Sequence, residues 1–239
     1  MTRPVVAIDG PAGAGKTSAS RALARRLGFA HVDTGAMYRA VGVLAEEQGV
    51  ALDDDAALGR LVADITFELA EGGERLLVRG GGAGSGAPGR AAVGRDLSDA
   101  IRGPHAGELA SKVSTRPVVR ERLVALQRIL GAGGNIVMEG RDIGTVVFPD
   151  AAAKLYLTAD PPERARRRAA ELRARGVDVD EQGLARELAR RDERDKGRVH
   201  SPLRPAADAI VLDTTELTLE AVVDAMESAV RARCPRLVP

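Results

Sequence analysis

Short runs of apolar residues recur along the chain, and longer segments with apolar positions three or four residues apart lie between them. The short runs span residues 5–9, 29–32, 136–139, 153–158 and 209–213. Their length is typical of buried strands, whereas segments such as 16–27 and 218–233 have the spacing of helices with one apolar face. This alternation predicts an α/β protein with a five-stranded, parallel, doubly wound sheet, which binds ligands at the carboxyl ends of its strands.

The pattern changes between about residues 49 and 104. Residues 65–69 and 75–78 resemble two strands joined by a Glu-Gly-Gly-Glu turn, which is a hairpin signal. The Gly-, Ala-, Ser- and Pro-rich run at 79–90 cannot bury a core, so we predict a flexible loop there. A hairpin does not belong in a purely parallel sheet and predicts an inserted subdomain. The predicted domains are therefore a core and an insertion: 1–48 with 105–239, and 49–104.

The first apolar run leads directly into GPAGAGKT at residues 10–17. Glycine, four residues and then Gly-Lys-Thr, placed between a strand and a helix, is the pattern of a phosphate-binding loop. Its glycines let the backbone turn its amides toward phosphate oxygens, and the following helix adds its positive end. Lys16 supplies charge for the outer phosphates, and the Thr17 hydroxyl suits Mg²⁺. The loop indicates a nucleoside triphosphate but leaves the phosphate acceptor open.

Acidic residues stand at the ends of three predicted strands, namely Asp9, Asp33 and Glu139. Carboxyl ends of parallel strands meet at one edge of a sheet, where an acid beside a phosphate-binding loop can hold Mg²⁺ or its waters. Acids also end strands simply as turn residues, and for Asp9 both interpretations stay open. For Glu139 we favour a functional role, because IVMEGRD places it together with Arg141 and Asp142 after an apolar strand.

Two further clusters can bind anions or sugar hydroxyls. In DTGAMYR, at 33–39, Thr34 and Gly35 are predicted to cap a helix that carries an arginine, although a cap and a surface arginine would look the same. Arg191, Asp195 and Arg198 have the spacing of one helix face, which could grip phosphate through guanidinium groups and a sugar hydroxyl through the carboxylate. A solvated, salt-bridged helix is the alternative for this second cluster.

Composition narrows the class of protein. The 239 residues carry a net charge of +1 and only 2% aromatic residues, which gives no electrostatic or stacking argument for a nucleic-acid partner or a membrane. Cys234 is the only cysteine, and the sequence shows no signal peptide and no apolar run of membrane-spanning length. We therefore expect a cytoplasmic protein, and we expect a monomer because no exposed apolar face stands out. His31, His105 and His200 share no metal-ligand spacing and are expected at surface or capping positions.

Several motifs together resemble one family, the bacterial cytidylate kinases, which are nucleoside monophosphate kinases. The matching segments run in the family's order: IDGPAGAGKT at 8–17, DTGAMYR at 33–39, ASKVS at 110–114, RPVVRERL at 116–123, EGRDIGTVVFPDA at 139–151, RRDERDKGR at 190–198 and SPL…AAD at 201–208. GRDIGTVVFPDA distinguishes this family from adenylate, thymidylate and shikimate kinases. The resemblance implies transfer of phosphate from ATP to CMP or dCMP with Mg²⁺, on a P-loop core with a monophosphate-binding insertion and a short lid near 160–178.

The resemblance also implies a role for each matching residue. ATP would be bound by Gly10, Pro11, Ala12, Gly13, Ala14, Gly15, Lys16, Thr17, Ser18, Arg164 and Arg168. The CMP phosphate would be bound by Thr34, Arg39, Arg141 and Arg198, the ribose by Arg191 and Asp195, and cytosine by Ser111, Arg120 and Asp142. The catalytic charges would be Lys16, Arg141, Arg191 and Arg198, and the metal ligands Thr17 and, through water, Glu139.

Two departures from the family pattern stand out. Glu139 occupies a position where the motif often has aspartate; the glutamate keeps the charge and adds a methylene between the backbone and the carboxylate. The Gly-rich run is also longer than the insertion usually carries. The alternatives are another P-loop small-molecule kinase, such as a uridylate or adenylate kinase, and a P-loop NTPase that acts as a switch.

Overall fold

The computed structural model describes residues 3–70, 75–80, 94–103 and 105–235. Contacts along the chain divide it into two compact units. The first combines the residues up to Val32 with those from Gly131 onward, and the second spans Asp33–Leu130. Within the described residues, no helix is both long and apolar enough to cross a membrane.

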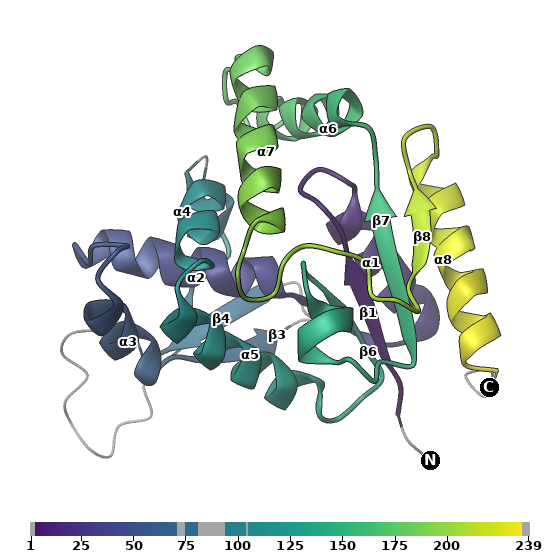
Figure 1. Ribbon diagram of the computed structural model, residues 1–239, viewed down its shortest axis with the longest axis horizontal. Coiled ribbons are helices and arrows are strands. Elements are labelled where there is room, and N and C mark those ends of the chain that lie inside the picture. Colours follow the sequence, from purple (N-terminus) through teal and green to yellow (C-terminus); the bar gives the residue numbers. More distant parts are fainter. Residues whose placement is uncertain (1–2, 71–74, 81–93, 104, 236–239) are drawn as a thin grey trace. The chain divides into compact units, whose positions relative to one another are not determined.

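The first unit is built on a five-stranded parallel sheet (Figure 1), as the apolar runs predict. Its strands are β1 (Val5–Asp9), β2 (Ala30–Asp33), β6 (Ile136–Glu139), β7 (Ala153–Thr158) and β8 (Ile210–Asp213), and they lie in the order β2-β6-β1-β7-β8. The central strand β1 pairs in parallel with β6 on one side and β7 on the other. The ends of β1 and β6 therefore lie side by side at the carboxyl edge of the sheet.

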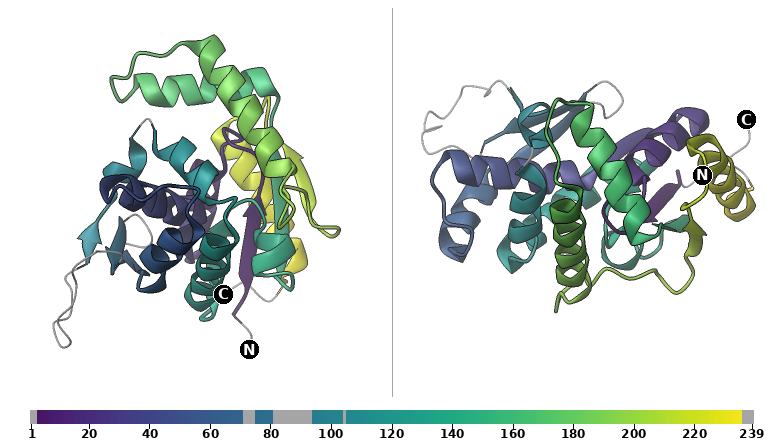
Figure 2. Two further views of the ribbon diagram at one scale, coloured as in Figure 1. Left: turned by 60° about the vertical axis from the view of Figure 1, so that its left-hand side comes forward. Right: turned by 90° about the horizontal axis from the view of Figure 1, so that it is seen from above.

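The helices of this unit form two groups. They are α1 (Lys16–Leu27), α6 (Pro161–Arg173), α7 (Glu181–Lys196) and α8 (Leu219–Arg233), with a π-helical turn at Ile143–Val147. Helices α1 and α8 contact each other and pack on the sheet through a core that includes Leu23, Leu155 and Met226. Helices α6 and α7 form a separate pair (Figure 2) around Ala169 and Leu188.

The second unit combines helices with a small antiparallel sheet. Its elements are α2 (Thr34–Glu47), α3 (Asp55–Ala63), β3 (Thr66–Ala70), β4 (Arg75–Arg79), β5 (Arg95–Asp96), a 3-10 helix (Ala100–Arg102), α4 (Ala106–Val113) and α5 (Pro117–Gly131). Strands β3 and β4 form the predicted hairpin, and β5 adds a third strand that the sequence did not indicate. The predicted turn at 71–74 and most of the predicted loop at 79–90 lie outside the described residues.

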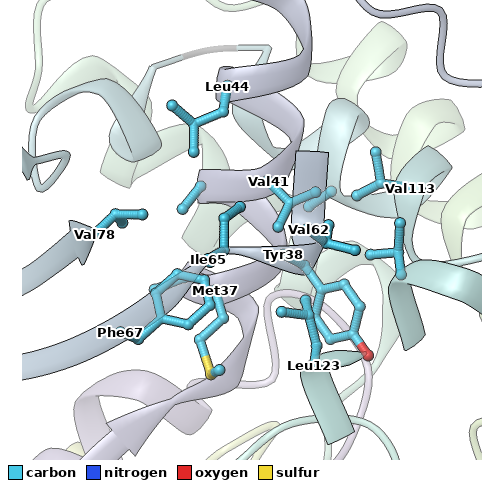
Figure 3. Packing of buried hydrophobic residues seen from close by; sticks show 14 of the residues in the cluster. Met37, Tyr38, Val41, Leu44, Val62, Ile65, Phe67, Val78, Val113 and Leu123 are labelled. Atoms are coloured by element: carbon cyan, nitrogen blue, oxygen red, sulfur yellow. The ribbon is translucent and has the colours of Figure 1, made fainter. Parts of the chain in front are cut away.

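One apolar core holds the second unit together (Figure 3), with Tyr38 and Val41 of α2 near Phe67 of β3 and Leu123 of α5. Helix α4 lies directly against α2, since a Cβ atom added at Gly42 would be 2.7 Å from the Leu109 Cβ. Because α2, α4 and α5 contribute to this core, the compact unit is larger than the insertion predicted at 49–104.

In the first unit, the close packing of the loop after β1 against β7 can be tested at Gly10. Gly10 has a φ of +147°, and a Cβ atom there would lie 2.0 Å from the Leu157 carbonyl oxygen. Gly28 also has a positive φ, +66°, but nothing lies within 4 Å of its Cβ position. We expect Gly28→Ala to cost about 1–2 kcal/mol of backbone strain, lowering Tm by roughly 2–8 °C. Gly10→Ala should lower Tm by at least twice as much, and equal losses measured by calorimetry would contradict this packing.

Candidate active site

The loop between β1 and α1 is closely packed against the start of α6. Gly13 has a φ of +77°, and a Cβ atom there would lie 2.9 Å from the Arg164 Cβ. Arg164 is buried and donates to the Ala12 carbonyl oxygen at 3.2 Å and to the Asp192 carboxylate at 2.6 Å. The arginine therefore joins α6, α7 and the loop backbone. Its predicted contact with ATP, like that of Arg168, which pairs with Glu171 at 2.7 Å, stays a prediction.

Lys16, the first residue of α1, is buried, and its Nζ donates to the Pro11 carbonyl oxygen at 2.7 Å. The pKa of Lys16 is lowered to about 7, chiefly by burial and also by the positive charges of Arg141 and Arg191, while Glu139 and Asp9 act in the opposite direction. The negative charges of the nearby acids therefore do not fully offset the cost of burying the positive charge of Lys16. An anionic ligand at this position would favour the charged form of the lysine.

Glu139, at the end of β6, is only 2% exposed and uses both carboxylate oxygens. Its Oε2 accepts a hydrogen bond from the Thr17 hydroxyl at 3.0 Å, and its Oε1 lies 3.0 Å from His31 Nε2. His31 is also 2% exposed, so the prediction of a surface or capping position for this histidine is wrong. No spacing motif in the sequence links His31 to Glu139, because the two residues are far apart in the chain and meet only on neighbouring strands.

Asp9, at the end of β1, anchors the turn that follows the Gly-Arg-Asp motif. Its two carboxylate oxygens accept from the backbone N–H groups of Ile143 and Gly144, both at 2.8 Å. Burial raises the pKa of Asp9 to about 6, although these two hydrogen bonds act in the opposite direction. Of the two interpretations left open for this acid, the structure shows the turn-forming one.

Asp195, near the end of α7, holds two arginines of the predicted phosphate and ribose site. Its Oδ2 accepts from Arg141 Nε at 3.1 Å, and its Oδ1 accepts from Arg198. Burial is the largest influence on this group and favours its protonated form, but Arg141, Arg198 and Arg191 together hold the pKa of Asp195 below its usual range. The side chains that the helix spacing grouped together are therefore brought into one charged cluster, with Arg141 added to it.

In the second unit, Asp33 rather than Thr34 or Gly35 caps α2, which corrects the predicted cap. Its Oδ1 accepts from the Ala36 backbone N–H at 3.1 Å, and its Oδ2 accepts from Arg39 Nη2 at 2.7 Å. Threonine, glycine and aspartate are all common caps, so the sequence alone did not distinguish Thr34 and Gly35 from Asp33. The carboxylate thereby orients Arg39 along the first turns of the helix.

The residues predicted to bind cytosine fall in both units. Ser111 on α4 and Arg120 on α5 are buried in the second unit, where the Arg120 guanidinium carbon lies 5.9 Å from the centre of the Tyr38 ring. Asp142 is buried in the first unit, immediately before the π-helical turn. A buried guanidinium, hydroxyl and carboxylate are unusual in cores and suit a polar ligand.

The oxygen atoms of Thr17 and Glu139 fit a magnesium ion that arrives with phosphates. Mg²⁺ typically takes one or two protein oxygens and completes its shell with phosphate oxygens and water. Within the described residues, no group of three or more His, Cys, Asp or Glu side chains could hold a metal ion by itself. The donor set therefore suits a metal that is shared with a substrate.

Comparisons with known proteins place the sequence beside one family. The family described as Cytidylate kinase matches residues 6–232. A protein named "Cytidylate kinase" from Geobacter sulfurreducens is 48% identical over 229 residues, which cover 96% of this chain and 93% of the relative. Another from Pelotomaculum thermopropionicum is 47% identical over 232 residues, which cover 96% of both chains.

The buried carboxylate of Asp9 predicts a pH-dependent stability. Its folded-state pKa of about 6 lies above the ordinary 3.8, so its contribution to stability is present below about pH 4 and is lost as pH rises through 6. Two pKa units correspond to about 2–3 kcal/mol. We expect the free energy of unfolding of the wild type, minus that of Asp9→Asn, to fall by about that amount between pH 4 and pH 7. A difference that is constant or rises with pH in denaturant titrations would contradict the assignment.

Proposed function

The chain belongs to the cytidylate kinase family, and on this premise we propose that it transfers the γ-phosphate of ATP to CMP or dCMP, giving ADP and CDP or dCDP. The observation that carries the proposal is the buried Lys16 ammonium in a phosphate-binding loop, beside arginines and with too little negative charge of its own. We further propose that the enzyme works as a cytoplasmic monomer.

In this proposal ATP lies along the loop from Gly10 to Ser18. The loop amides and the positive end of α1 bind the phosphates, and Lys16 exchanges its bond to the Pro11 carbonyl for the outer phosphates. Bound Mg²⁺ would neutralise charge on the phosphate oxygens, and the residues that would hold it are Thr17 directly and Glu139 through water. Arg168 would approach the phosphates from the lid, and Arg164 supports the loop from the same helix.

The acceptor would be gripped at three points. Arg39, Arg141, Arg198 and Thr34 would bind its phosphate, Arg191 and Asp195 its ribose, and Ser111, Arg120 and Asp142 its base. Cytosine carries an amino group that the Asp142 carboxylate could accept from, whereas uracil presents a carbonyl oxygen at that position. This difference favours CMP over UMP as the acceptor.

The reaction needs positioning more than proton transfer. The attacking atom is a phosphate oxygen of CMP, which is largely deprotonated at neutral pH, so no general base is required. We infer direct in-line transfer without a covalent intermediate, in which Lys16, Arg141, Arg191 and Arg198 stabilise the charge of the migrating group. Exclusion of water by the lid would keep ATP from being hydrolysed.

An assay with several nucleoside monophosphates distinguishes the proposed function from the alternative kinases and from an NTPase switch. A coupled assay with CMP, dCMP, UMP and AMP should give the highest kcat/KM with CMP or dCMP. A preference for UMP or AMP would favour a uridylate or adenylate kinase. ATP hydrolysis that needs no acceptor would instead favour a P-loop NTPase switch.

Lys16→Met should lower kcat at least 10²- to 10³-fold, because it removes a charge that neutralises the transferred phosphate. The variant should keep its Tm, since the substitution removes a buried ammonium and leaves the methylene packing in place. Steady-state assays and calorimetry on the same preparations check both statements. Near-normal turnover would refute the role of the loop.

Asp142→Ala should raise KM for CMP about ten- to a hundredfold, the usual effect of losing a charged hydrogen bond, and leave KM for ATP within twofold. Asp150→Ala, which removes an exposed carboxylate from the same segment, is the matched control and should change neither constant. Equal losses for CMP and ATP in the Asp142 variant would contradict its role in base recognition.

A further inference from the structure

An imidazole, a carboxylate and a hydroxyl form a continuous hydrogen-bonded chain across three elements of the first unit, in which the imidazole and the carboxylate are buried and the hydroxyl belongs to an exposed residue. His31 on β2 contacts one oxygen of Glu139 on β6, and Thr17 on α1 contacts the other, each at 3.0 Å. The proposed function uses Thr17 and Glu139 but leaves His31 without a role. Within the described residues its ring makes a hydrogen bond to Glu139 alone, so we argue its effect on the reaction through that carboxylate.

Only one of the two ring nitrogens of His31 has a hydrogen-bond partner among the described residues. An ionised carboxylate only accepts, so His31 Nε2 must carry the proton that joins it to Glu139. Its other ring nitrogen, Nδ1, is buried and has no hydrogen-bond partner among the described residues. Burying an unsatisfied ring nitrogen costs stability, and an apolar side chain at position 31 would avoid that cost. The bond to Glu139 is therefore the interaction that this imidazole provides.

Glu139 has a particular need for such a partner. Glutamate has one more rotatable bond than the aspartate that the motif often carries, so its carboxylate can adopt more orientations. Thr17 is exposed and its hydroxyl would turn toward a bound metal, which would remove one of the two contacts that hold the carboxylate. The contact with His31 is made to the other carboxylate oxygen, so it can persist when a ligand binds.

We propose that His31 is a positioning residue that fixes the Glu139 carboxylate toward Thr17 and the magnesium ion carried by ATP. The inference rests on the proposed kinase function and on the metal role of Glu139. Partners that orient a carboxylate at a metal typically change metal affinity or activity 10- to 100-fold when they are removed. His31 therefore tunes the metal-nucleotide site and not the recognition of CMP.

Three substitutions separate the hydrogen bond from the volume of the side chain. The amide nitrogen of His31→Gln reaches about as far as Nε2 and can restore the donor, whereas that of His31→Asn reaches only as far as Nδ1. His31→Phe keeps a planar ring and removes all hydrogen bonding. The readouts are the affinity for Mn²⁺ in the presence of a non-hydrolysable ATP analogue, followed by electron paramagnetic resonance, together with Tm and the KM for CMP.

We expect His31→Asn and His31→Phe to weaken Mn²⁺ binding 10- to 100-fold and His31→Gln to stay within about threefold of the wild type. KM for CMP should be unchanged in all three variants, and Tm should not follow the loss of metal affinity. Wild-type Mn²⁺ affinity in His31→Asn and His31→Phe would overturn the proposal, as would an equal loss in His31→Gln. If His31→Phe does not fold, the comparison of Gln with Asn decides.

Glu139→Gln distinguishes the possible failures. If it weakens Mn²⁺ binding and His31→Asn does not, the role of His31 is wrong while the metal role of Glu139 stands. If Glu139→Gln leaves Mn²⁺ binding unchanged, the premise fails and the His31 proposal with it. Failure of the wild type to phosphorylate CMP would refute the proposed function, even where the His31 variants still alter binding of the metal and the ATP analogue. The double variant His31→Phe/Glu139→Gln should be no weaker than Glu139→Gln alone, because both changes act on one interaction.

Discussion

The structure depends on burying positive charge at the carboxyl edge of a parallel sheet. Lys16 is placed there by the strand, loop and helix geometry, and Arg141 and Arg191 lie close enough to lower its pKa. The acids nearby are already engaged. Asp9 accepts two backbone amides, and Glu139 accepts from Thr17 and lies against His31. These carboxylates orient their neighbours more than they cancel charge, so the phosphates of the substrates would supply the missing negative charge.

Helices α6 and α7 also hold the phosphate-binding loop and the charged cluster in place. Arg164 bonds the loop backbone at Ala12, the chain after β7 at Ala159 and the carboxylate of Asp192 on α7. Asp195, one turn further along α7, ties Arg141 and Arg198 together. One helix thus supports the phosphate-binding loop through one aspartate and organises the charged cluster through another. A change in the position of α7 would therefore affect both the phosphate-binding loop and the cluster of Arg141, Asp195 and Arg198.

The apolar pattern predicted the five sheet strands and the helices at 16–27 and 218–233, because short apolar runs that alternate with longer segments of helical spacing are typical of a parallel α/β sheet. The pattern could not show β5, a two-residue strand of charged side chains, or the burial of His31, whose partner is 108 residues away. Nor could it decide between a metal-binding and a turn-forming Asp9, since the partners of that carboxylate are backbone amides that carry no sequence signal. Motifs indicated which residues matter, and only the fold showed which of them touch.

The central claim, direct transfer of phosphate from ATP to CMP, is tested most directly by following the label from ATP carrying a radioactive γ-phosphate. The account predicts that the label appears in CDP, in equal amount to the ADP formed, and that almost none appears as inorganic phosphate while CMP is present. Label released mainly as inorganic phosphate, at a rate that does not depend on CMP, would contradict it.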